Sequence, residues 1–313
     1  MPALSIKSPG KTILFGEHAV VHGQPAIAVP LNSIQLKINI LARPDWPDHS
    51  VRIYNKDTSE STLLSKLAND HPIQAGLRII LDHLNIEKIP SSELTITSTI
   101  PIASGLGSSA ALANALVRCI SQFLGFKLSD QKVNDLAFEI EKIQHGSPSG
   151  IDNTVVTYGR PIYFIKGQAV EFLSLPEPLT LILADSGSRS LTRETVAQVG
   201  ERLASQPDVI QPIFARMGEI AREAKNELQA GKLEHIGQLM TENHQLLAQL
   251  GVSLSSLDLL VQTAFLAGAW GAKLCGSGRG GFMVAIADPA RAQVVAQALT
   301  STGAASTLIE HVH

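Results

Sequence analysis

The segment Pro101–Ala111, PIASGLGSSAA, carries the strongest chemical signal in the sequence. Gly105 and Gly107 remove side chains where a backbone would approach a ligand closely. Ser108 and Ser109 stand at the start of a predicted helix, where the first N–H groups lack partners and the dipole is positive. This predicts a phosphate site with a hydroxyl that could ligate Mg²⁺. An ordinary capped helix after a glycine turn would explain the same residues.

A second segment, Ser8–Gly23, places one lysine, one glutamate and two histidines among apolar residues and glycines. Lys11 lies in an apolar stretch, where a surface lysine is less expected. A lysine beside a reacting hydroxyl stabilises developing alkoxide charge. The alternatives are a turn lysine and, for His18 and His22, ordinary core or surface histidines. A zinc site is disfavoured because the H-E-x-x-H order is absent.

Two carboxylates flank a loop rich in Gly, Pro and Ser in a third segment, Glu141–Asn153. Glu141 is predicted near the end of a helix, and Asp152 follows the loop. One carboxylate could hold Mg²⁺ while the other accepts a proton or orients a hydroxyl. A solvated helix-end glutamate and an N-cap aspartate are the alternative.

The fourth segment, Lys273–Gly281, has four glycines in six residues. They leave the backbone bare for close approach to a phosphate or to another loop. A tight hairpin explains the pattern equally well. Arg279 could meet phosphates or a charged substrate group, but a solvent-facing loop arginine is favoured slightly.

Two apparent nucleotide motifs are set aside. Gly10-Lys11-Thr12 ends like a P-loop, but Ser5 stands where that motif needs its first glycine, and the apolar residues after it predict no helix. The spacing from Gly276 to Gly281 matches a dinucleotide fingerprint. A strand is predicted after it, whereas that fold requires a helix.

The elements that must position these residues follow from periodicity. Residues 34–40 alternate apolar and polar, as in a half-buried strand. Ser129 is predicted to cap the helix that ends near Gln144. Strands are predicted at 4–8 (stopped by Pro9-Gly10), 93–100, 162–165, 170–173, 179–184, 272–275, 282–287 and 307–309, and helices at 73–84, 108–124, 289–302 and over most of 192–260. The irregular mixture predicts an α+β fold.

Length and composition bound the class of protein. The 313 residues suit two domains, which we place at 1–177 and 178–313 on either side of a proline-rich junction. Hydrophobic residues make up 44% and charged residues 17%, as in a globular chain, and a net charge of −3 disfavours nucleic-acid binding. No long apolar run or secretion signal is visible, and two cysteines fit a reducing compartment. We therefore expect a cytoplasmic protein with no membrane partner.

In this order, the four segments resemble the motifs of the GHMP kinase family, from Ser8 to Gly281. The Pro-x-x-x-Gly-Leu-Gly-Ser-Ser-Ala-Ala stretch is similar to that family's phosphate loop. The segments Ser8–Gly23 and Glu141–Asn153 are most similar to those of members that phosphorylate mevalonate. The resemblance implies an N-terminal α+β domain, a ferredoxin-like C-terminal domain and an active site in the cleft between them.

The resemblance also implies roles for single residues. Asp152 and Lys11 would be catalytic, and the metal ligands of Mg²⁺ would be Ser108 and Glu141. ATP would be bound by Pro101, Ser104, Gly105, Leu106, Gly107, Ser108, Ser109 and Ala110. Mevalonate would be contacted by Lys11, Glu17, His18, Gly150, Asp152 and Thr192. A homodimer is compatible with this assignment.

Some positions depart from the family pattern. Leu191 replaces a serine beside Thr192, and Cys275, Ser277 and Arg279 stand where the family usually has Thr, Ala and often Gly. These departures leave the reaction class intact but bear on substrate preference. The alternatives are a kinase of phosphomevalonate or homoserine, a catalytically silent nucleotide-binding member, and a structural or nucleic-acid-binding protein on a related fold.

Overall fold

The computed structural model describes residues 3–102, 104–146, 148–189 and 192–313, with the backbone alone at 192 and 193. Contacts divide the chain into two compact units. The first comprises residues up to Gly10, Ser33–Pro101 and Gly107–Gly159, and the second comprises Lys11–Asn32, Ile102–Leu106 and Arg160–His313. The chain therefore passes between the units several times. The expected boundary after residue 177 falls inside the second unit and stays a prediction.

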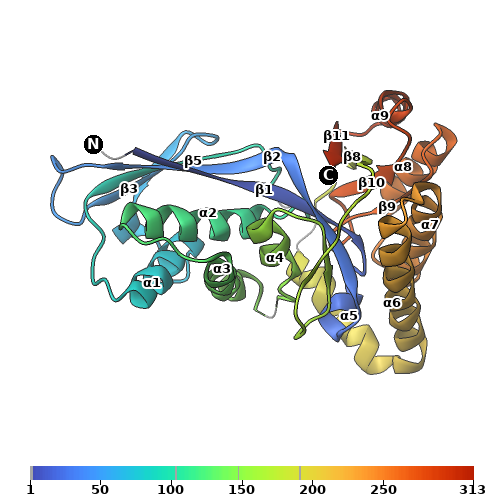
Figure 1. Ribbon diagram of the computed structural model, residues 1–313, viewed down its shortest axis with the longest axis horizontal. Coiled ribbons are helices and arrows are strands. Elements are labelled where there is room, and N and C mark those ends of the chain that lie inside the picture. Colours follow the sequence, from blue (N-terminus) through green and yellow to red (C-terminus); the bar gives the residue numbers. More distant parts are fainter. Residues whose placement is uncertain (1–2, 103, 147, 190–191) are drawn as a thin grey trace. The chain divides into compact units, whose positions relative to one another are not determined.

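The first unit is a sheet with helices packed on it. Its elements are the first part of β1 (Ala3–Phe15), the second part of β2 (Ala26–Ala42), β3 (Val51–Asn55), β4 (Glu60–Leu63), η2 (Leu64–Lys66), α1 (Pro72–Leu84), β5 (Ser92–Ser98), α2 (Ser108–Phe123), α3 (Asp130–His145) and α4 (Ile151–Tyr158). The strand order is β4-β3-β5-β2, with β3 and β5 parallel. Within this unit the four α-helices lie on one face of the sheet (Figure 1).

Periodicity predicted β2, β5 and the helices α1, α2 and α3 of the first unit, but it missed β3 and β4. Ile34, Leu36, Ile38 and Ile40 are buried, and the strand that carries them pairs antiparallel with β5. The hydroxyl of Ser129 accepts a hydrogen bond from the Lys132 N–H at 3.3 Å, which confirms the predicted cap of α3.

The prediction that Pro9-Gly10 ends the first strand is wrong. β1 continues through both residues to Phe15, and its ladder partner is β2. Proline lacks the N–H that a central strand needs, but a strand at the edge of a sheet does not need every N–H. Lys11 therefore lies within a strand and not in a turn.

The second unit contains a ferredoxin-like arrangement, as expected. Its elements are η1 (Ala19–His22), β6 (Ile162–Phe164), β7 (Glu171–Phe172), β8 (Leu179–Asp185), α5 (Thr192–Ser205), α6 (Pro207–Gln229), α7 (Leu233–Gln249), α8 (Ser255–Leu266), β9 (Gly271–Leu274), β10 (Phe282–Ile286), α9 (Ala292–Ser301) and β11 (Ser306–Val312). The sheet order β11-β8-β10-β9 is antiparallel throughout. Helices follow β8, a glycine loop joins β9 to β10, and α9 leads to β11, which completes the β-α-β-β-α-β pattern.

A single apolar cluster holds this second unit together. Buried side chains of β8, β9 and β10 meet those of α6, α8 and α9, among them Ile182, Met217, Leu260 and Val295. Every residue of β8 and β10 is buried. β10 is apolar throughout (FMVAI), whereas β8 also carries the buried polar residues Thr180 and Asp185.

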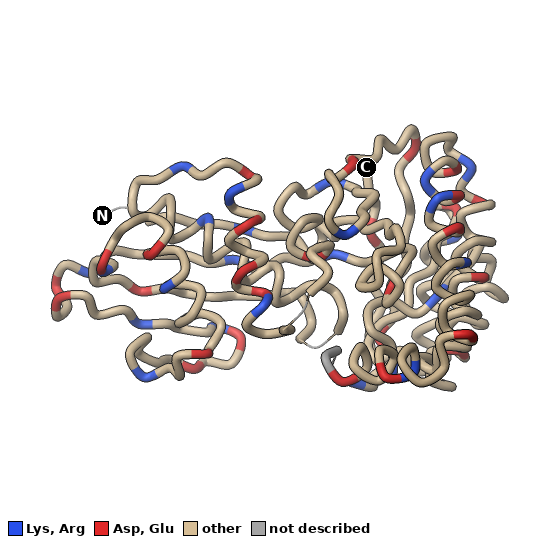
Figure 2. The backbone as a smooth tube through the Cα atoms, turned by 90° about the horizontal axis from the view of Figure 1, so that it is seen from below, with Lys and Arg blue, Asp and Glu red and all other residues tan. Residues whose placement is uncertain are grey.

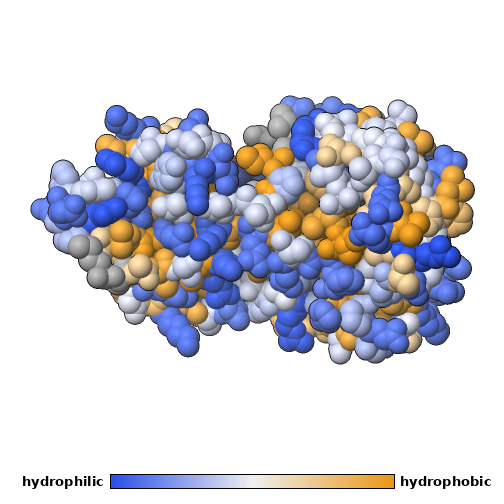
Figure 3. All heavy atoms as spheres, turned by 90° about the horizontal axis from the view of Figure 1, so that it is seen from above, coloured by the Kyte–Doolittle hydropathy of each residue, from blue (hydrophilic) through white to orange (hydrophobic). Residues whose placement is uncertain are grey.

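The surface mixes charges and apolar side chains. Figure 2 shows Lys and Arg interspersed with Asp and Glu along the backbone of each unit. In Figure 3, hydrophilic residues cover most of the visible face, with hydrophobic ones between them. Across the part of the chain that the structure describes, no helix is long and apolar enough to span a bilayer.

Candidate active site

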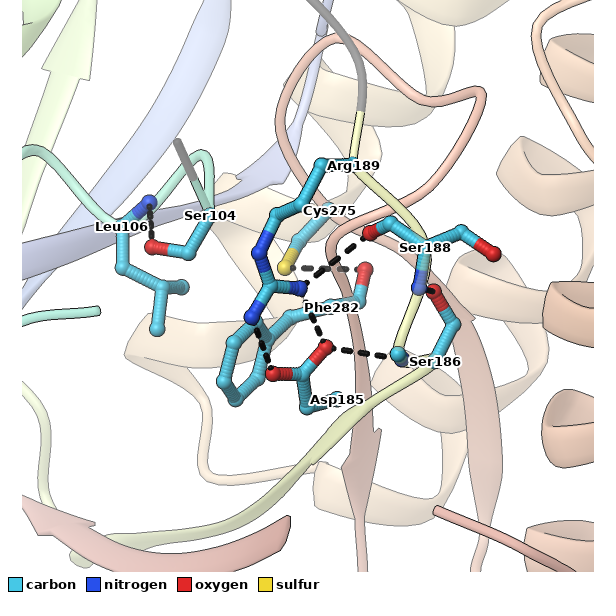
Figure 4. Close-up of polar contacts among 9 residues, drawn as sticks. Ser104, Leu106, Asp185, Ser186, Ser188, Arg189, Cys275 and Phe282 are labelled. Carbon is cyan, nitrogen blue, oxygen red and sulfur yellow. Dashed lines mark hydrogen bonds and ion pairs between the residues drawn. The ribbon is translucent and has the colours of Figure 1, made fainter. Parts of the chain in front are cut away.

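The predicted phosphate loop joins β5 to the N-terminus of α2. Gly105 and Gly107 have φ of 79° and 84°, a region that glycine adopts without strain. Gly107 is the N-cap of α2, and no side chain caps the first turn. The turn thus presents N–H groups and a positive dipole, as an anion site requires. Before it, the buried Ser104 hydroxyl accepts a hydrogen bond from the Leu106 N–H at 3.3 Å (Figure 4).

The phosphate loop and the glycine cluster touch backbone to backbone. A Cβ on Gly105 would lie 3.1 Å from the Cα of Gly276, and one on Gly281 would lie 2.9 Å from the carbonyl oxygen of Ser104. The sequence left open whether the glycine-rich backbone of Lys273–Gly281 approaches a phosphate or another loop. In the structure, another loop fills that space. The glycines of the two motifs thus support each other, although 170 residues of sequence lie between them.

We expect Gly105→Ala to weaken nucleotide binding. The methyl group would push the loop from Gly276, and we expect KM for ATP to rise about tenfold, or ~1.4 kcal/mol. Gly125→Ala is the matched control, because Gly125 has φ of 88° and nothing within 4 Å of the position of a Cβ. Both variants should lose similar stability from backbone strain, but only the first should change KM. Equal KM values would contradict the contact.

Glu141 meets a serine hydroxyl and a histidine within the first unit. Its carboxylate is 2% exposed, and Oε2 accepts a hydrogen bond from Ser109 Oγ at 3.2 Å. The same hydroxyl lies 3.1 Å from His145 Nε2, which is 3.8 Å from the carboxylate. The sequence pointed to Ser108 beside Glu141, whereas the structure brings its neighbour Ser109 there. His145 was missed, although its i+4 spacing from Glu141 puts both on one face of α3.

The donors around Glu141 fit a magnesium ion better than a softer metal. The buried Glu141 carboxylate and the Ser109 hydroxyl are hard oxygen ligands, and Mg²⁺ usually takes one or two carboxylates together with substrate phosphates and water. Among the described residues, no group of three or more His, Cys, Asp and Glu side chains is arranged to hold a metal alone. The Glu141 carboxylate and the Ser109 hydroxyl fit a magnesium ion that shares its coordination with substrate phosphates and water.

Asp152 lies in the first turn of α4, and Gly150 is the N-cap. The alternative in which Asp152 caps the helix is therefore wrong, and the residue is half-buried. Asn153 fixes the helix, because its amide donates to Asn134 Oδ1 at 2.7 Å. The Thr154 hydroxyl donates to the Gly150 carbonyl at 2.6 Å. Asp152 thus directly precedes two anchored residues, at the helix end that favours negative charge.

Lys11 is buried on β1, with 3% of its surface exposed. Its backbone N–H donates to the Leu106 carbonyl at 2.9 Å, so the strand is tied to the phosphate loop within the second unit. The alternative of an exposed turn lysine is wrong. A buried ammonium group needs a charged or polar role, because burial without one is costly.

The Glu17–His18 turn is held by the glycine-cluster segment. Glu17 is 1% exposed, and its two carboxylate oxygens face Lys273 Nζ and, at 3.4 Å, Asn243 Nδ2. His18 Nε2 lies 2.9 Å from the Ser277 carbonyl and must donate to it. Glu17 is therefore engaged by protein groups, whereas the sequence expected a substrate contact. Neither Lys273 nor Asn243 was singled out by sequence.

Burial lowers the pKa of His18 to about 4, and nearby His22 and Lys273 add to this against the hydrogen bond to Ser277. The imidazole is consequently neutral at neutral pH. Because Nε2 carries the proton, Nδ1 presents a lone pair, and Nδ1 is buried without a hydrogen-bond partner. Such an atom can accept a hydrogen bond from a hydroxyl.

We expect stability to fall as pH drops below about 6.5. In the unfolded chain His18 takes a proton near pH 6.5, whereas in the folded chain it does so only near pH 4, so protonation favours unfolding inside this window. The His18 share is about 3 kcal/mol at pH 4. Lowered pKa values of His22 and His244 act in the same direction.

The measurement is urea unfolding of the wild type, His18→Gln and the exposed-histidine control His313→Gln at pH 7.5 and 4.5. The pH dependence should shrink for His18→Gln alone. An unchanged dependence in that variant would contradict the assignment.

An ion pair in the second unit joins the end of β8 to the loop that follows it (Figure 4). The Arg189 guanidinium donates to both carboxylate oxygens of Asp185 at 2.7 Å. Burial raises the pKa of Asp185, but the bonds from Arg189 and the Gly187 N–H outweigh this and lower it. Backbone bonds join this loop to the glycine cluster, from Gly281 N to the Ser188 carbonyl and from Ser186 N to the Gly281 carbonyl. Sequence patterns gave no sign of this pair.

Arg279 binds protein groups of the second unit. Its backbone has φ of 56°, its N–H donates to the Val252 carbonyl at 2.7 Å, and its guanidinium donates to Gly251 and Gln198. Arg279 is thus a loop arginine, as the sequence favoured, and its side chain also has a structural role, since it joins the glycine cluster to α5. Thr192 is the first residue of α5, and its side chain lies outside the described residues.

The remaining residues implied for ATP binding belong to the same loop and helix. Pro101 precedes the loop, Ala110 is buried in α2, and Ser108 is half-buried at the first position of α2.

Comparisons with known proteins match this geometry. The family model described as GHMP kinases N terminal domain matches residues 71–160, and that described as GHMP kinases C terminal matches residues 224–305. The mevalonate kinase of Pyrococcus horikoshii is 35% identical over 95% of this chain and 92% of its own. That of Mus musculus is 31% identical over 96% of this chain and 91% of its own.

Solved structures agree. The crystal structure of L. major mevalonate kinase in complex with R-mevalonate has a TM-score of 0.86 at 29% identity, covering 99% of this chain and 96% of that chain. The glycine loop before α2, the buried Glu141 and the glycine cluster between β9 and β10 lie in the order that the motifs require. This chain belongs to the GHMP kinase family.

Proposed function

We propose that this protein transfers the γ-phosphoryl group of ATP to the C5 hydroxyl of mevalonate, giving 5-phosphomevalonate. The observation that carries the proposal is the near-full-length similarity to mevalonate kinases together with the retained phosphate loop, Lys11, Glu141 and Asp152. A catalytically silent member would have no need of the full set.

The chemistry is an in-line displacement in which positioning and charge neutralisation do most of the work. Asp152 accepts the proton of the C5 hydroxyl as its oxygen bonds to the γ-phosphorus, and the bond to the leaving ADP oxygen breaks. Lys11 stabilises the negative charge that develops on the attacking oxygen. The first turn of α2 holds the ATP phosphates through its backbone N–H groups.

Magnesium is the metal we propose, with Glu141 and a hydroxyl at the start of α2 as ligands. When bound, Mg²⁺ would neutralise negative charge on the phosphoryl group that is being transferred. Ser108 was the hydroxyl indicated by sequence. The 3.2 Å contact between Ser109 and Glu141 favours Ser109 as the partner.

A pair of serine variants tests which hydroxyl serves the metal. We expect Ser109→Ala to raise the Mg²⁺ concentration needed for half-maximal rate by about tenfold, whereas Ser108→Ala, the matched control one residue away, should raise it less. Titration of activity with MgCl₂ at fixed ATP measures both. A larger effect of Ser108→Ala would restore the assignment made from sequence.

The proposed reaction is tested by ADP release with Mg-ATP and each of mevalonate, phosphomevalonate, homoserine and galactose. We expect kcat/KM for mevalonate to exceed the others by at least about 100-fold. Preference for phosphomevalonate or homoserine would assign a different member of the family. ADP release with none of them would favour the silent nucleotide-binding member.

We propose a cytoplasmic location and a homodimer as further properties of this kinase. The two cysteines, Cys119 and Cys275, are both free and buried, as suits a reducing compartment. Exposed Phe265 and Leu266 near the end of α8 are apolar side chains that a second copy could cover. Cell fractionation and light scattering after gel filtration test these two properties. The expected position of the active site between the domains also stays a prediction.

A further inference from the structure

Lys273 is the unexpected charged residue of the second unit. It lies on β9 and is 0% exposed, although lysine is among the residues least often fully buried. Its ammonium group forms an ion pair with Glu17 and donates to the Leu274 carbonyl at 2.8 Å. Removing a charged group from water is costly, so a lysine at this place needs a reason beyond packing.

Glu17 is held from two elements at once. Lys273 of β9 engages one carboxylate oxygen, and Asn243 of α7 donates to the other at 3.4 Å. Both oxygens of Glu17 are engaged by protein groups, and 1% of the residue is exposed. This geometry suits a group that fixes the turn in which it lies.

The same turn is fastened a second time, through His18. The His18 Nε2–H donates to the carbonyl of Ser277 at 2.9 Å, four residues after Lys273. Two successive residues of the turn therefore bind two places on one short segment, which runs from β9 into the glycine cluster.

The turn needs such fastening, because its backbone is strained. Gly16, with φ of 90°, is unstrained as a glycine, but a Cβ there would lie 2.5 Å from the Pro25 carbonyl oxygen, so the turn is tightly packed. His18 has φ of 61° and ψ of −52°, which a residue with a side chain rarely adopts. Strained conformations persist only where the surroundings over-determine them, and they cluster at functional sites.

We infer that Lys273 is a positioning residue, which acts through Glu17 to hold the His18 imidazole so that its unpaired Nδ1 accepts a hydrogen bond from the acceptor substrate. This rests on the proposed function for the identity of that acceptor, mevalonate. It assigns Glu17 to the scaffold of the turn instead of to the substrate. Loss of the ion pair should therefore weaken acceptor binding more than ATP binding.

A purely structural role of the ion pair makes a different prediction. Lys273→Met alone leaves a buried carboxylate without its partner and is strongly destabilising. The double variant Glu17→Met/Lys273→Met replaces the pair with apolar groups of similar volume, which often restores stability. If the pair served stability alone, the double variant would recover both folding and mevalonate binding.

The experiment compares the wild type, Glu17→Met/Lys273→Met, Asn243→Ala and the control Lys225→Met. Lys225 is ion-paired with Glu171 at 2.6 Å on the surface of the same unit. Its replacement therefore measures the effect of losing a lysine ion pair outside the Glu17–His18 turn. We expect KM for mevalonate to rise at least about tenfold in the double variant and less in Asn243→Ala, with KM for ATP within about twofold. Lys225→Met should match the wild type.

A second measurement needs no substrate. Nitrogen-15 NMR of the imidazole, assigned by difference against His18→Gln, reports the tautomer of His18 directly. We expect the Nε2–H form alone in the wild type and a mixture of tautomers in the double variant. A folded double variant with wild-type KM for mevalonate and an unchanged tautomer would overturn the inference. If the double variant does not fold, an Asn243→Ala variant with wild-type KM for mevalonate and an unchanged His18 tautomer would overturn it instead.

The two proposals fail separately. If the wild type releases no ADP with mevalonate, the proposed function is wrong, and the NMR result still decides whether Lys273 positions His18. If the wild type phosphorylates mevalonate and the His18 tautomer is the same with and without the ion pair, the proposed function stands and the positioning role of Lys273 is wrong.

Discussion

Replacing Asp152 with asparagine should lower kcat by at least about 100-fold. Asparagine keeps the shape of the side chain but cannot accept the proton of the C5 hydroxyl. The bonds from Asn153 to Asn134 and from Thr154 to the Gly150 carbonyl hold the first turn of α4, and the variant keeps these anchors. Steady-state kinetics with circular dichroism of the purified variant make the measurement.

Asp135→Asn is the matched control. Asp135 lies on α3, is 48% exposed and pairs with Lys132 on the surface. It should show wild-type kinetics, since an exposed ion pair contributes little. Turnover of Asp152→Asn within a few fold of the wild type would rule out Asp152 as the proton acceptor. A large loss of kcat with KM for ATP unchanged would fit a role on the acceptor side.

Replacing Lys11 with methionine should also reduce kcat by about 100-fold or more. The loss of one positive group that stabilises developing charge has an effect of ~10²–10³ in comparable sites. Methionine preserves the unbranched shape of the buried side chain, and the β1 backbone bond from Lys11 N to the Leu106 carbonyl does not depend on the side chain. The expected signature is a fall in kcat larger than any change in KM for ATP.

Lys7→Met serves as the control for Lys11→Met. Lys7 lies on the same strand, four residues earlier, but is exposed. It should retain full activity and stability, because an exposed side chain on a strand has few contacts to lose. Wild-type turnover in a folded Lys11→Met variant would show that Lys11 has a structural role only.

Local patterns predicted most of the elements. The alternation through residues 34–40 gave a strand, and Ser129 gave the start of α3, since both depend on contacts a few residues apart. Pro9-Gly10 misled the prediction, because whether a proline interrupts a strand depends on the position of that strand in the sheet. An edge strand tolerates it, and sequence periodicity does not report edges.

Some features of the candidate site were visible in local sequence patterns, and others depended on packing. The motif around Gly105 and the position of Glu141 near the end of a helix were visible in the sequence, as was the i+4 signal that could have found His145. The contact of Ser109 with Glu141 was not visible, because neighbouring residues on a helix point about 100° apart and only packing shows which one faces α3. The Asp185–Arg189 pair was equally hidden, although its members are four residues apart, since the loop between β8 and α5 has no periodicity to read.

By itself, the sequence indicated the reaction class through its resemblance to a kinase family, and it named candidate site residues, because phosphate loops and flanking carboxylates are local patterns. Only the tertiary structure decided what supports them. Lys273 and Glu17 are 256 residues apart, and nothing near either one indicates a buried ion pair. Gly105 and Gly276 likewise looked like two separate phosphate motifs, yet their backbones touch. Burial and long-range pairing are properties of the packed chain, so a residue's partner is settled when the β9–β10 loop and the Glu17 turn come together.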